Sequence, residues 1–275
     1  MTATFTERLL QIQARKKSVL CVGLDPDPAR MPPHLFAGAT PAAAVVAFNT
    51  ALIEATAAVA CAYKLNLAFY EALGAEGWRA LEATCRQLPD DVLVIADGKR
   101  GDIGNSARFY ARSVFEQLGC DACTVTPYMG HDAVQPFLAY PGKAAFVLAR
   151  TSNPGAADFQ ERDCRGEPLY LYVARQVAAW AAEAPGDGGL VAGATSAAAL
   201  RTLREACPDL PLLIPGVGAQ GGDARAVMQA AGRGPVLINS SRQILYAAGG
   251  TDFAEAAARE AERLRQTLEE ARGRA

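Results

Sequence analysis

Two carboxylates flank an ammonium group in the segment DGKRGDIG, residues 97–104: Asp97, Lys99 and Asp102. The segment follows the apolar run VLVIA, which is typical of a buried strand. A lysine buried alone tends to lose its proton, whereas an opposite charge within about 4–6 Å favours the charged form. The spacing therefore predicts a charged lysine held between acids at a strand end, which suits electrostatic or acid–base chemistry.

Polar residues also stand at the ends of other apolar runs. Asp25 follows SVLCVGL, Lys64 lies within AYKLNLA, and Ser152 follows AAFVLART. Arg242 follows PVLINSS. Each residue alone is unremarkable in a soluble protein. Together they predict one site, provided that the fold brings these strand ends to the same place.

The rest of the chain alternates between two patterns. Short apolar runs without polar alternation are typical of parallel strands covered on both faces, and eight occur, at residues 18–24, 62–68, 92–97, 122–128, 144–150, 189–195, 211–217 and 235–241. A segment with helical spacing follows each run. This predicts an α/β protein, a single (β/α)8 TIM barrel over residues 1–275, with an extra helix at 4–16 closing its bottom. A doubly wound open sheet is the alternative, which the regular repetition makes less favoured.

A barrel would place chemistry at the C-terminal strand ends and phosphate at the loops after strands seven and eight. The string GVGAQG, residues 216–221, matches the dinucleotide pattern G-x-G-x-x-G, but it comes seventh and no acid follows at the required distance. A nicotinamide site is therefore not expected. The glycines instead predict a backbone-amide cradle for an anion, opening a helix at Asp223. Arg242 would contact the same phosphate, although a surface arginine is the alternative.

Composition and charge exclude several classes of protein. Hydrophobic residues make up 51% and the net charge is −2, which allows a sizeable core but gives no basic field for nucleic acid. No charge-free apolar run reaches the ~18 residues of a membrane span and no signal peptide is evident, so we expect no membrane partner and a cytoplasmic location. Seven cysteines favour reduced packing thiols, CDAC at 120–123 included, and two distant histidines make a metal site improbable.

These motifs together resemble the orotidine 5'-phosphate decarboxylases, and most closely their longer bacterial subgroup (type 2). DGKRGDIGNSARFYA is similar to the family's D-x-K-x-x-D-I signature. The strings VGLDP, YKLNLAFYEALG, TSNPGA, PGVGAQGGD and the SR at 241–242 follow the family's order over most of the chain. D-x-K-x-x-D alone is shared with 3-keto-gulonate-6-phosphate decarboxylases and hexulose-phosphate synthases, which carry an acid near the end of strand two and use magnesium. Lys64 in that strand favours the metal-free branch.

The resemblance implies a reaction without cofactor or metal. Orotidine 5'-phosphate loses its C6 carboxylate as CO2 and becomes uridine 5'-phosphate (UMP), the last step of pyrimidine nucleotide synthesis. A cation already oriented in a water-poor pocket stabilises the C6 carbanion without reorganisation. Lys99 is expected to stabilise the carbanion and deliver the proton to C6. Asp97 and Asp102 would keep Lys99 charged, and Lys64 would extend the alternation of charge.

The resemblance also implies how the nucleotide is held. Asp25 and Lys64 would bind ribose hydroxyls, Ser152 the amide edge of the pyrimidine, Gln220 the base and phosphate, and Arg242 the phosphate. The implied substrate-binding set is Asp25, Lys64, Ile103, Ser106, Ser152, Pro215, Gln220, Gly221, Ser241 and Arg242. In the family, the residues matching Asp102 and Ile103 reach into the neighbouring subunit's site. The resemblance therefore implies a homodimer.

Other interpretations of the same residues stay open. Lys99 and Asp102 have the i, i+3 spacing of a weak surface ion pair, and Lys64 could be a solvent-exposed lysine at a strand end. A metal-dependent sugar-phosphate decarboxylase or aldolase could use the same barrel, and a noncatalytic barrel could bind UMP without converting orotidine 5'-phosphate. The loop that covers the substrate is expected near 216–224 or at 153–168.

Overall fold

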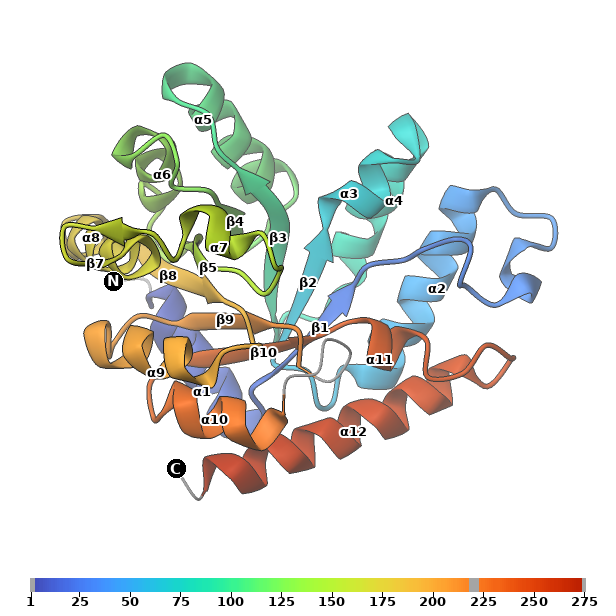
Figure 1. Cartoon of the computed structure of the whole chain (residues 1–275). Helices are drawn as coiled ribbons and strands as arrows, with labels where there is room; N and C mark the ends of the chain where they lie inside the picture. Colours follow the sequence, from blue (N-terminus) through green and yellow to red (C-terminus); the bar gives the residue numbers. More distant parts are fainter. Residues whose placement is uncertain (1–2, 218–222, 274–275) are drawn as a thin grey trace.

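A computed structural model gives the structure of the chain and describes residues 3–217 and 223–273. Eight parallel strands close into a barrel in the order β1-β10-β9-β8-β5-β4-β3-β2 (Figure 1). The strands are β1 (Leu20–Leu24), β2 (Ala62–Asn66), β3 (Leu93–Arg100), β4 (Ala122–Val125), β5 (Ala144–Arg150), β8 (Asp187–Ala192), β9 (Leu212–Pro215) and β10 (Val236–Ser240). The predicted TIM barrel is therefore confirmed, and the open sheet is wrong.

Helices cover the outside of the barrel, and each helical segment expected from the sequence contains one. They are α2 (Pro41–Thr56), α4 (Gly74–Gln87), α5 (Gly104–Arg112), α6 (His131–Leu138), α8 (Leu169–Ala182), α9 (Ala197–Ala206), α10 (Ala224–Ala231) and α12 (Phe253–Arg272). Shorter helical turns are η1 (Pro33–Phe36), α3 (Leu67–Glu71), η2 (Ser113–Gln117), α7 (Ala156–Phe159) and α11 (Arg242–Leu245). The strands are buried between these helices and the side chains that fill the barrel.

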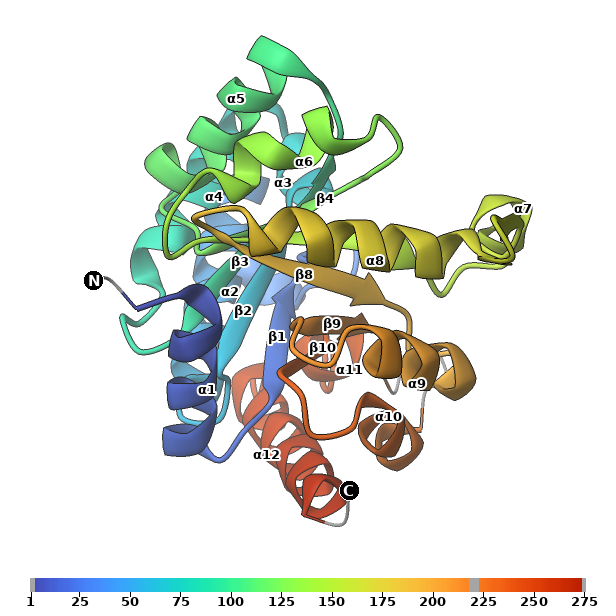
Figure 2. The ribbon, with the colours of Figure 1, turned by 90° about the vertical axis from the view of Figure 1, so that its left-hand side faces the viewer.

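The N-terminal helix α1 (Phe5–Lys16) closes the bottom of the barrel, as predicted. Its first turn is fixed by a capping box in which Thr4 and Glu7 satisfy each other's backbone N–H groups. Its buried face, Phe5, Leu9 and Ile12, joins the apolar cluster inside the lower barrel. Figure 2 shows α1 at the side where β8 begins and α7 at the side where β8 ends. Because α1 covers the end where the strands begin, the end where the strands finish remains open for a site.

The connection between β5 and α8 contains structure that the sequence did not predict. It forms α7 and a two-stranded antiparallel hairpin of β6 (Asp163–Cys164) and β7 (Glu167–Pro168). Arg165 and Gly166, which join these strands, both have positive φ (60° and 86°). A two-residue turn of this kind matches the twist of a hairpin. This connection projects beyond the C-terminal end of the barrel (Figure 2).

Candidate active site

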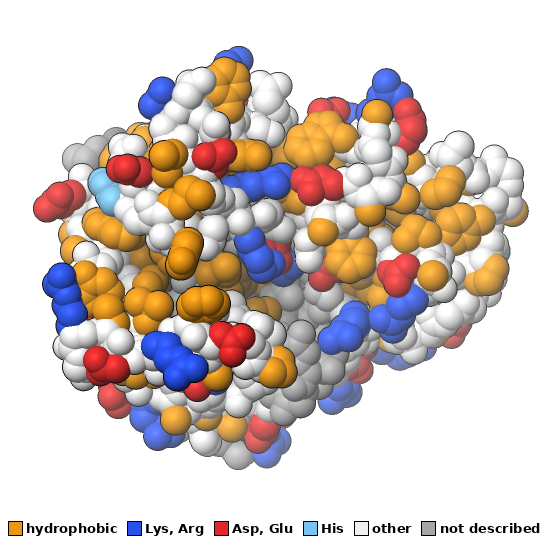
Figure 3. Space-filling view, turned by 45° about the horizontal axis from the view of Figure 1, so that its top comes forward, with side chains coloured by type: hydrophobic (Ala, Val, Ile, Leu, Met, Phe, Trp, Pro, Cys, Tyr) orange, Lys and Arg blue, Asp and Glu red, His pale blue; other side chains and the backbone are white. Residues whose placement is uncertain are grey.

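A cavity of about 580 Å³ opens at the C-terminal ends of the barrel strands. Figure 3 looks onto this face and shows a hollow with basic side chains at its edge. The described residues that line the cavity include Asp25, Asp27, Arg30, Lys64, Asn66, Asp97, Lys99, Thr124, Pro215, Asn239, Ser240, Ser241, Arg242 and Tyr246. Most of the polar residues that the sequence placed at strand ends therefore meet in one cavity.

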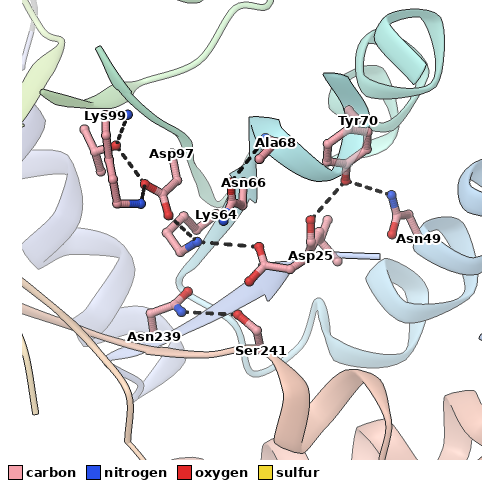
Figure 4. A network of polar contacts seen from close by, with 12 residues as sticks. Asp25, Asn49, Lys64, Asn66, Ala68, Tyr70, Asp97, Lys99, Asn239 and Ser241 are labelled. Carbon is pink, nitrogen blue, oxygen red and sulfur yellow. Dashed lines mark hydrogen bonds and ion pairs between the residues drawn. The ribbon is translucent and has the colours of Figure 1, made fainter. Parts of the chain in front are cut away.

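Four charged side chains with alternating sign form a row across the floor of this cavity (Figure 4). Lys64 Nζ lies 2.8 Å from Asp97 Oδ2 and 3.6 Å from Asp25 Oδ1. Lys99 Nζ donates to the other oxygen of Asp97 at 2.7 Å. Lys64 is buried, so the interpretation of it as a solvent-exposed lysine is wrong. Lys99, with 48% of its side chain exposed, is the end of the row that stays open to a ligand.

The two buried members of the row stabilise each other's charged forms. Burial raises the pKa of Asp97, but the charges of Lys64 and Lys99 outweigh it and hold that pKa well below its ordinary value. Burial likewise lowers the pKa of Lys64, and the carboxylates of Asp25 and Asp97 more than reverse the effect, so its pKa is raised. Asp97 and Lys64 therefore both carry charge around neutral pH.

Thr124 on β4 belongs to the same network, although nothing in the sequence singled it out. Its hydroxyl donates to Asp97 Oδ1 at 2.8 Å and accepts from the backbone N–H of Lys99 at 2.9 Å. Lys99 itself has φ of 44°, the left-handed region that a lysine rarely adopts. A threonine in a strand is common, so its residue type gives no functional signal. The irregularity of β3 that brings Lys99 next to Thr124 cannot be read from the sequence.

Asp102 lies apart from this row. It is half-buried, its Oδ1 accepts from the backbone N–H of Ile103, and it lines a separate hollow on α5 together with Ser106, Phe109 and Tyr110. Among the described residues no ion pair joins Asp102 to Lys99, so within one chain Asp97 alone flanks the lysine. The expectation of two flanking acids is not met by a single chain. Ser106 is exposed in this hollow, and Ile103 is exposed in a second hollow between α5 and α6.

The predicted phosphate side is assembled in part from described residues. Pro215 ends β9, Ser241 follows β10, and Arg242 begins α11 with its side chain at the cavity. Asp223 caps α10, as predicted, by accepting from the N–H of Arg225. Gln220 and Gly221 lie outside the described residues. The amide cradle expected over 216–221 therefore stays a prediction.

Ser152 is half-buried and is not one of the described residues that line the cavity. It packs closely against Gly193, because a Cβ added to that glycine would come within 2.7 Å of the Ser152 amide nitrogen. The close approach joins the end of β5 to the residue after β8. Its role toward a pyrimidine base stays a prediction.

Tyr246, directly after α11, is hydrogen-bonded to the loop that follows β1. The sequence did not indicate this contact. The Tyr246 hydroxyl accepts from the N–H of Asp27 at 2.7 Å and donates to the carbonyl of Asp25 at 3.1 Å. Arg30 lies over its ring, with Cζ 4.0 Å from the centroid. These contacts hold Asp25 in place at the cavity.

Several buried oxygens in the cavity lining accept no hydrogen bond from the part of the chain that the structure describes. They are Asp25 Oδ1, Asn239 Oδ1 and Ser240 Oγ. Buried polar atoms normally have a partner, so these are the atoms of lining residues whose hydrogen-bonding capacity the described chain leaves unused. Within residues 3–217 and 223–273, no group of three or more His, Cys, Asp and Glu side chains could hold a metal ion. The same residues contain no helix long and apolar enough to cross a membrane.

Comparison with known proteins gives one consistent answer. The model of the orotidine 5'-phosphate decarboxylase / HUMPS family matches residues 18–259. An orotidine 5'-phosphate decarboxylase from Herpetosiphon aurantiacus is 50% identical over 255 residues, covering 92% of this chain and 93% of that protein. Another, from Dehalococcoides mccartyi, is 46% identical and covers 98% of this chain and 99% of that protein. The structure of Leishmania donovani OMP decarboxylase is 40% identical, with a TM-score of 0.81 over 96% of this chain and 99% of that one.

Proposed function

This chain belongs to the orotidine 5'-phosphate decarboxylase / HUMPS family, and we propose that the row Asp25, Lys64, Asp97 and Lys99 carries out its reaction. The enzyme is a lyase that converts orotidine 5'-phosphate to UMP and CO2 in pyrimidine biosynthesis. The observation that carries the proposal is the half-exposed ammonium of Lys99, paired with the buried carboxylate of Asp97 at the cavity.

The chemistry requires a place for an electron pair. When the bond between C6 and the carboxylate breaks, CO2 leaves and the electron pair stays on C6, which has no conjugated sink. Lys99 Nζ donates one hydrogen bond to Asp97 and has further N–H groups directed away from it, so it can stabilise the carbanion and then donate a proton to C6. Solvent then returns a proton to the amine. Because Asp97 fixes the amine beforehand, little reorganisation is needed during the reaction.

The remaining cavity groups supply substrate binding. Asp25 and Lys64 would hold ribose hydroxyls, and their adjacent positions in the cavity lining support this role. Arg242, with Pro215 and Ser241 beside it in the lining, would bind the phosphate through a charge-assisted contact. Ser152, Gln220 and Gly221 would complete the pocket for the base and phosphate. No cofactor or metal is part of this mechanism.

A direct assay follows the loss of the orotate absorbance of orotidine 5'-phosphate. Wild-type protein should consume the substrate, and Lys99→Ala should lose nearly all turnover. Lys143→Ala is the matched control, because Lys143 pairs with Asp121 at the bottom of the barrel, away from the cavity. Near-wild-type turnover by Lys99→Ala would refute the assignment of the proton donor.

Two rival functions predict different results. A noncatalytic nucleotide-binding barrel would bind UMP but leave the absorbance unchanged over hours. A metal-dependent sugar-phosphate decarboxylase or aldolase would lose activity on treatment with a chelator, whereas our mechanism predicts no effect of chelation.

The position of Asp102 supports a homodimer in which this acid completes the neighbouring site. Asp102 and Ser106 line a surface hollow that also carries the exposed rings of Phe109 and Tyr110. Ile103, the next residue after Asp102, is 50% exposed and lines a second hollow. Exposed apolar residues beside an unpaired acid suit a contact between copies of the chain. In this arrangement Asp102 approaches the partner's amine and Ile103 covers its substrate. A cytoplasmic location also remains part of the proposal.

Mixing two inactive variants tests this arrangement. Lys99→Ala and Asp102→Ala homodimers, once their subunits exchange, form hybrids with one site that has both native residues. Activity should recover to about a quarter of wild type, because half of the dimers are hybrids and each has one intact site of two. A mixture that stays inactive while subunit exchange is demonstrated would contradict a shared site.

A further inference from the structure

Among the described residues that line the cavity, Thr124 is the one that β4 provides. The side chain is buried, with about 1% of the residue exposed, and its hydroxyl makes the two hydrogen bonds described above, to Lys99 N–H and to Asp97 Oδ1. A buried hydroxyl is as a rule satisfied, so hydrogen bonding alone does not mark a functional residue. What distinguishes Thr124 is that both of its partners belong to the reacting row.

The pairing of β3 with β4 explains why Thr124 meets Lys99. Ala96 pairs with Cys123 and Arg100 pairs with Val125, so three residues on β3, 97–99, face Thr124 alone on β4. The irregularity turns the backbone at Lys99 into the left-handed region, at a cost of order 1 kcal/mol or more for a residue that is not glycine. The amide of Lys99 donates to the Thr124 side chain, not to a strand carbonyl.

The direction of the hydroxyl proton follows from these contacts. Because Thr124 Oγ1 accepts from Lys99 N–H, its own proton is free to point elsewhere, and Asp97 Oδ1 lies 2.8 Å away. The same oxygen of Asp97 also accepts from Lys99 Nζ at 2.7 Å. One hydroxyl is thus attached to the backbone of Lys99 and to the carboxylate that holds its amine. The Lys99 side chain is therefore held at its backbone end by Thr124 and at its ammonium end by Asp97.

We propose that Thr124 is a positioning residue for decarboxylation, whose hydroxyl aims the Lys99 ammonium at C6 of the substrate by holding both its backbone and its counter-ion. The inference rests on the proposed function, because it assumes that Lys99 acts on C6. Thr124 acts through Lys99 and Asp97 and needs no contact with the substrate. Its effect should therefore fall on turnover and not on binding of UMP, which has no carboxylate at C6.

Thr124→Val and Thr124→Ser separate the hydroxyl from the shape of the side chain. Valine keeps the volume but leaves Lys99 N–H without an acceptor and removes a donor to Asp97, so kcat should fall about 10- to 100-fold. The affinity for UMP, measured by calorimetry, should stay close to that of wild type. Serine keeps the hydroxyl and should restore most of kcat.

Thr84→Val is the matched control for loss of a buried threonine hydroxyl. Thr84 on α4 is also about 1% exposed, donates to the carbonyl of Ala80 and accepts from Asn49. Its removal should lower the melting temperature without lowering kcat. A parallel loss of stability in both valine variants, with a loss of kcat only in Thr124→Val, is the expected pattern.

Three outcomes overturn the inference. Wild-type kcat in Thr124→Val would show that the hydroxyl does not aim the amine. Equal losses of kcat and UMP affinity, without rescue by Thr124→Ser, would show a general structural role. A wild-type protein that fails to convert orotidine 5'-phosphate, or a Lys99→Ala variant that converts it fully, would refute the proposed function and this inference with it. If only the predictions for the Thr124 variants fail, the proposed function still stands.

Discussion

Replacing Asp97 with asparagine tests how much the charged row contributes to both stability and catalysis. The carboxylate of Asp97 accepts from Lys64 at 2.8 Å, from Lys99 at 2.7 Å and from Thr124 at 2.8 Å. Asparagine keeps the shape but removes the charge, and its amide NH2 turns a donor toward an ammonium. The buried Lys64 is then left with Asp25 at 3.6 Å as its acid.

The loss of stability comes mostly from Lys64. Breaking a buried ion pair by removing one partner costs about 3–5 kcal/mol, whereas a pair with a half-exposed lysine such as Lys99 contributes under about 1 kcal/mol. The melting temperature of Asp97→Asn should therefore fall by about 6 °C or more. The kcat should fall about 10- to 100-fold, because the amine of Lys99 loses a charge-assisted hydrogen bond.

The pH dependence of stability gives an independent check with a defined sign. The pKa of Asp97 is lowered in the folded protein, so its contribution is present above the unfolded value of about 3.9 and is lost as the pH falls toward the folded value. Asparagine has no such dependence. The difference in unfolding free energy between wild type and Asp97→Asn should be full at pH 7 and smaller at pH 3, as measured by urea denaturation.

Asp121→Asn is the matched control. Asp121 is buried to a similar extent, with 10% of its side chain exposed against 9% for Asp97, and it pairs with Arg8 and Lys143 at the bottom of the barrel. The control should lose stability and keep kcat. If Asp97→Asn retained wild-type stability and turnover, or if Asp121→Asn lost as much turnover, the reasoning from the row would be wrong.

Three further changes test other parts of the structure. Arg204→Lys should lower the melting temperature by about 6 °C or more and keep kcat, because the buried guanidinium donates to five backbone carbonyls and an ammonium has at most three donors. Gly23→Ala should weaken UMP binding measured by calorimetry, because the added Cβ would lie 1.9 Å from Ser241 Oγ at the cavity. Gly249→Ala is the control and should bind UMP normally, because its added Cβ meets no atom within 4 Å. Arg242→Ala should weaken UMP binding about tenfold or more yet leave uridine binding unchanged, because uridine has no phosphate.

Residue pattern alone predicted the barrel because strands covered on both faces must be apolar throughout. The runs at 18–24 and 235–241 became neighbouring strands β1 and β10, and the polar residues that end them reached the same cavity. The hairpin of β6 and β7 was missed because two-residue strands have no periodicity to detect, and Arg165–Gly166 is not among the usual turn pairs.

Within the site, sequence spacing located the charges but not their neighbours. Asp97 and Lys99 meet because they are two residues apart on one irregular strand, whereas Asp102, three residues further, is carried to the hollow on α5. The positive φ of 44° at Lys99 changes the direction of the chain between Asp97 and Asp102. No glycine or asparagine at position 99 indicates this conformation in the sequence. Thr124 was missed for the same reason, since its importance depends on the register between β3 and β4.

The two lysines of the row have different surroundings, and the difference supports the separate roles that we propose for them. Lys64 has 5% of its side chain exposed and lies between two acids, so its charge is held by its neighbours and its pKa is raised. Such a group is a poor proton donor but a stable source of positive potential. Lys99 has one acid within its own chain and an open side toward the cavity. In the proposed mechanism, Lys64 therefore supplies permanent positive charge at the cavity floor, and Lys99 supplies the proton that the carbanion at C6 requires.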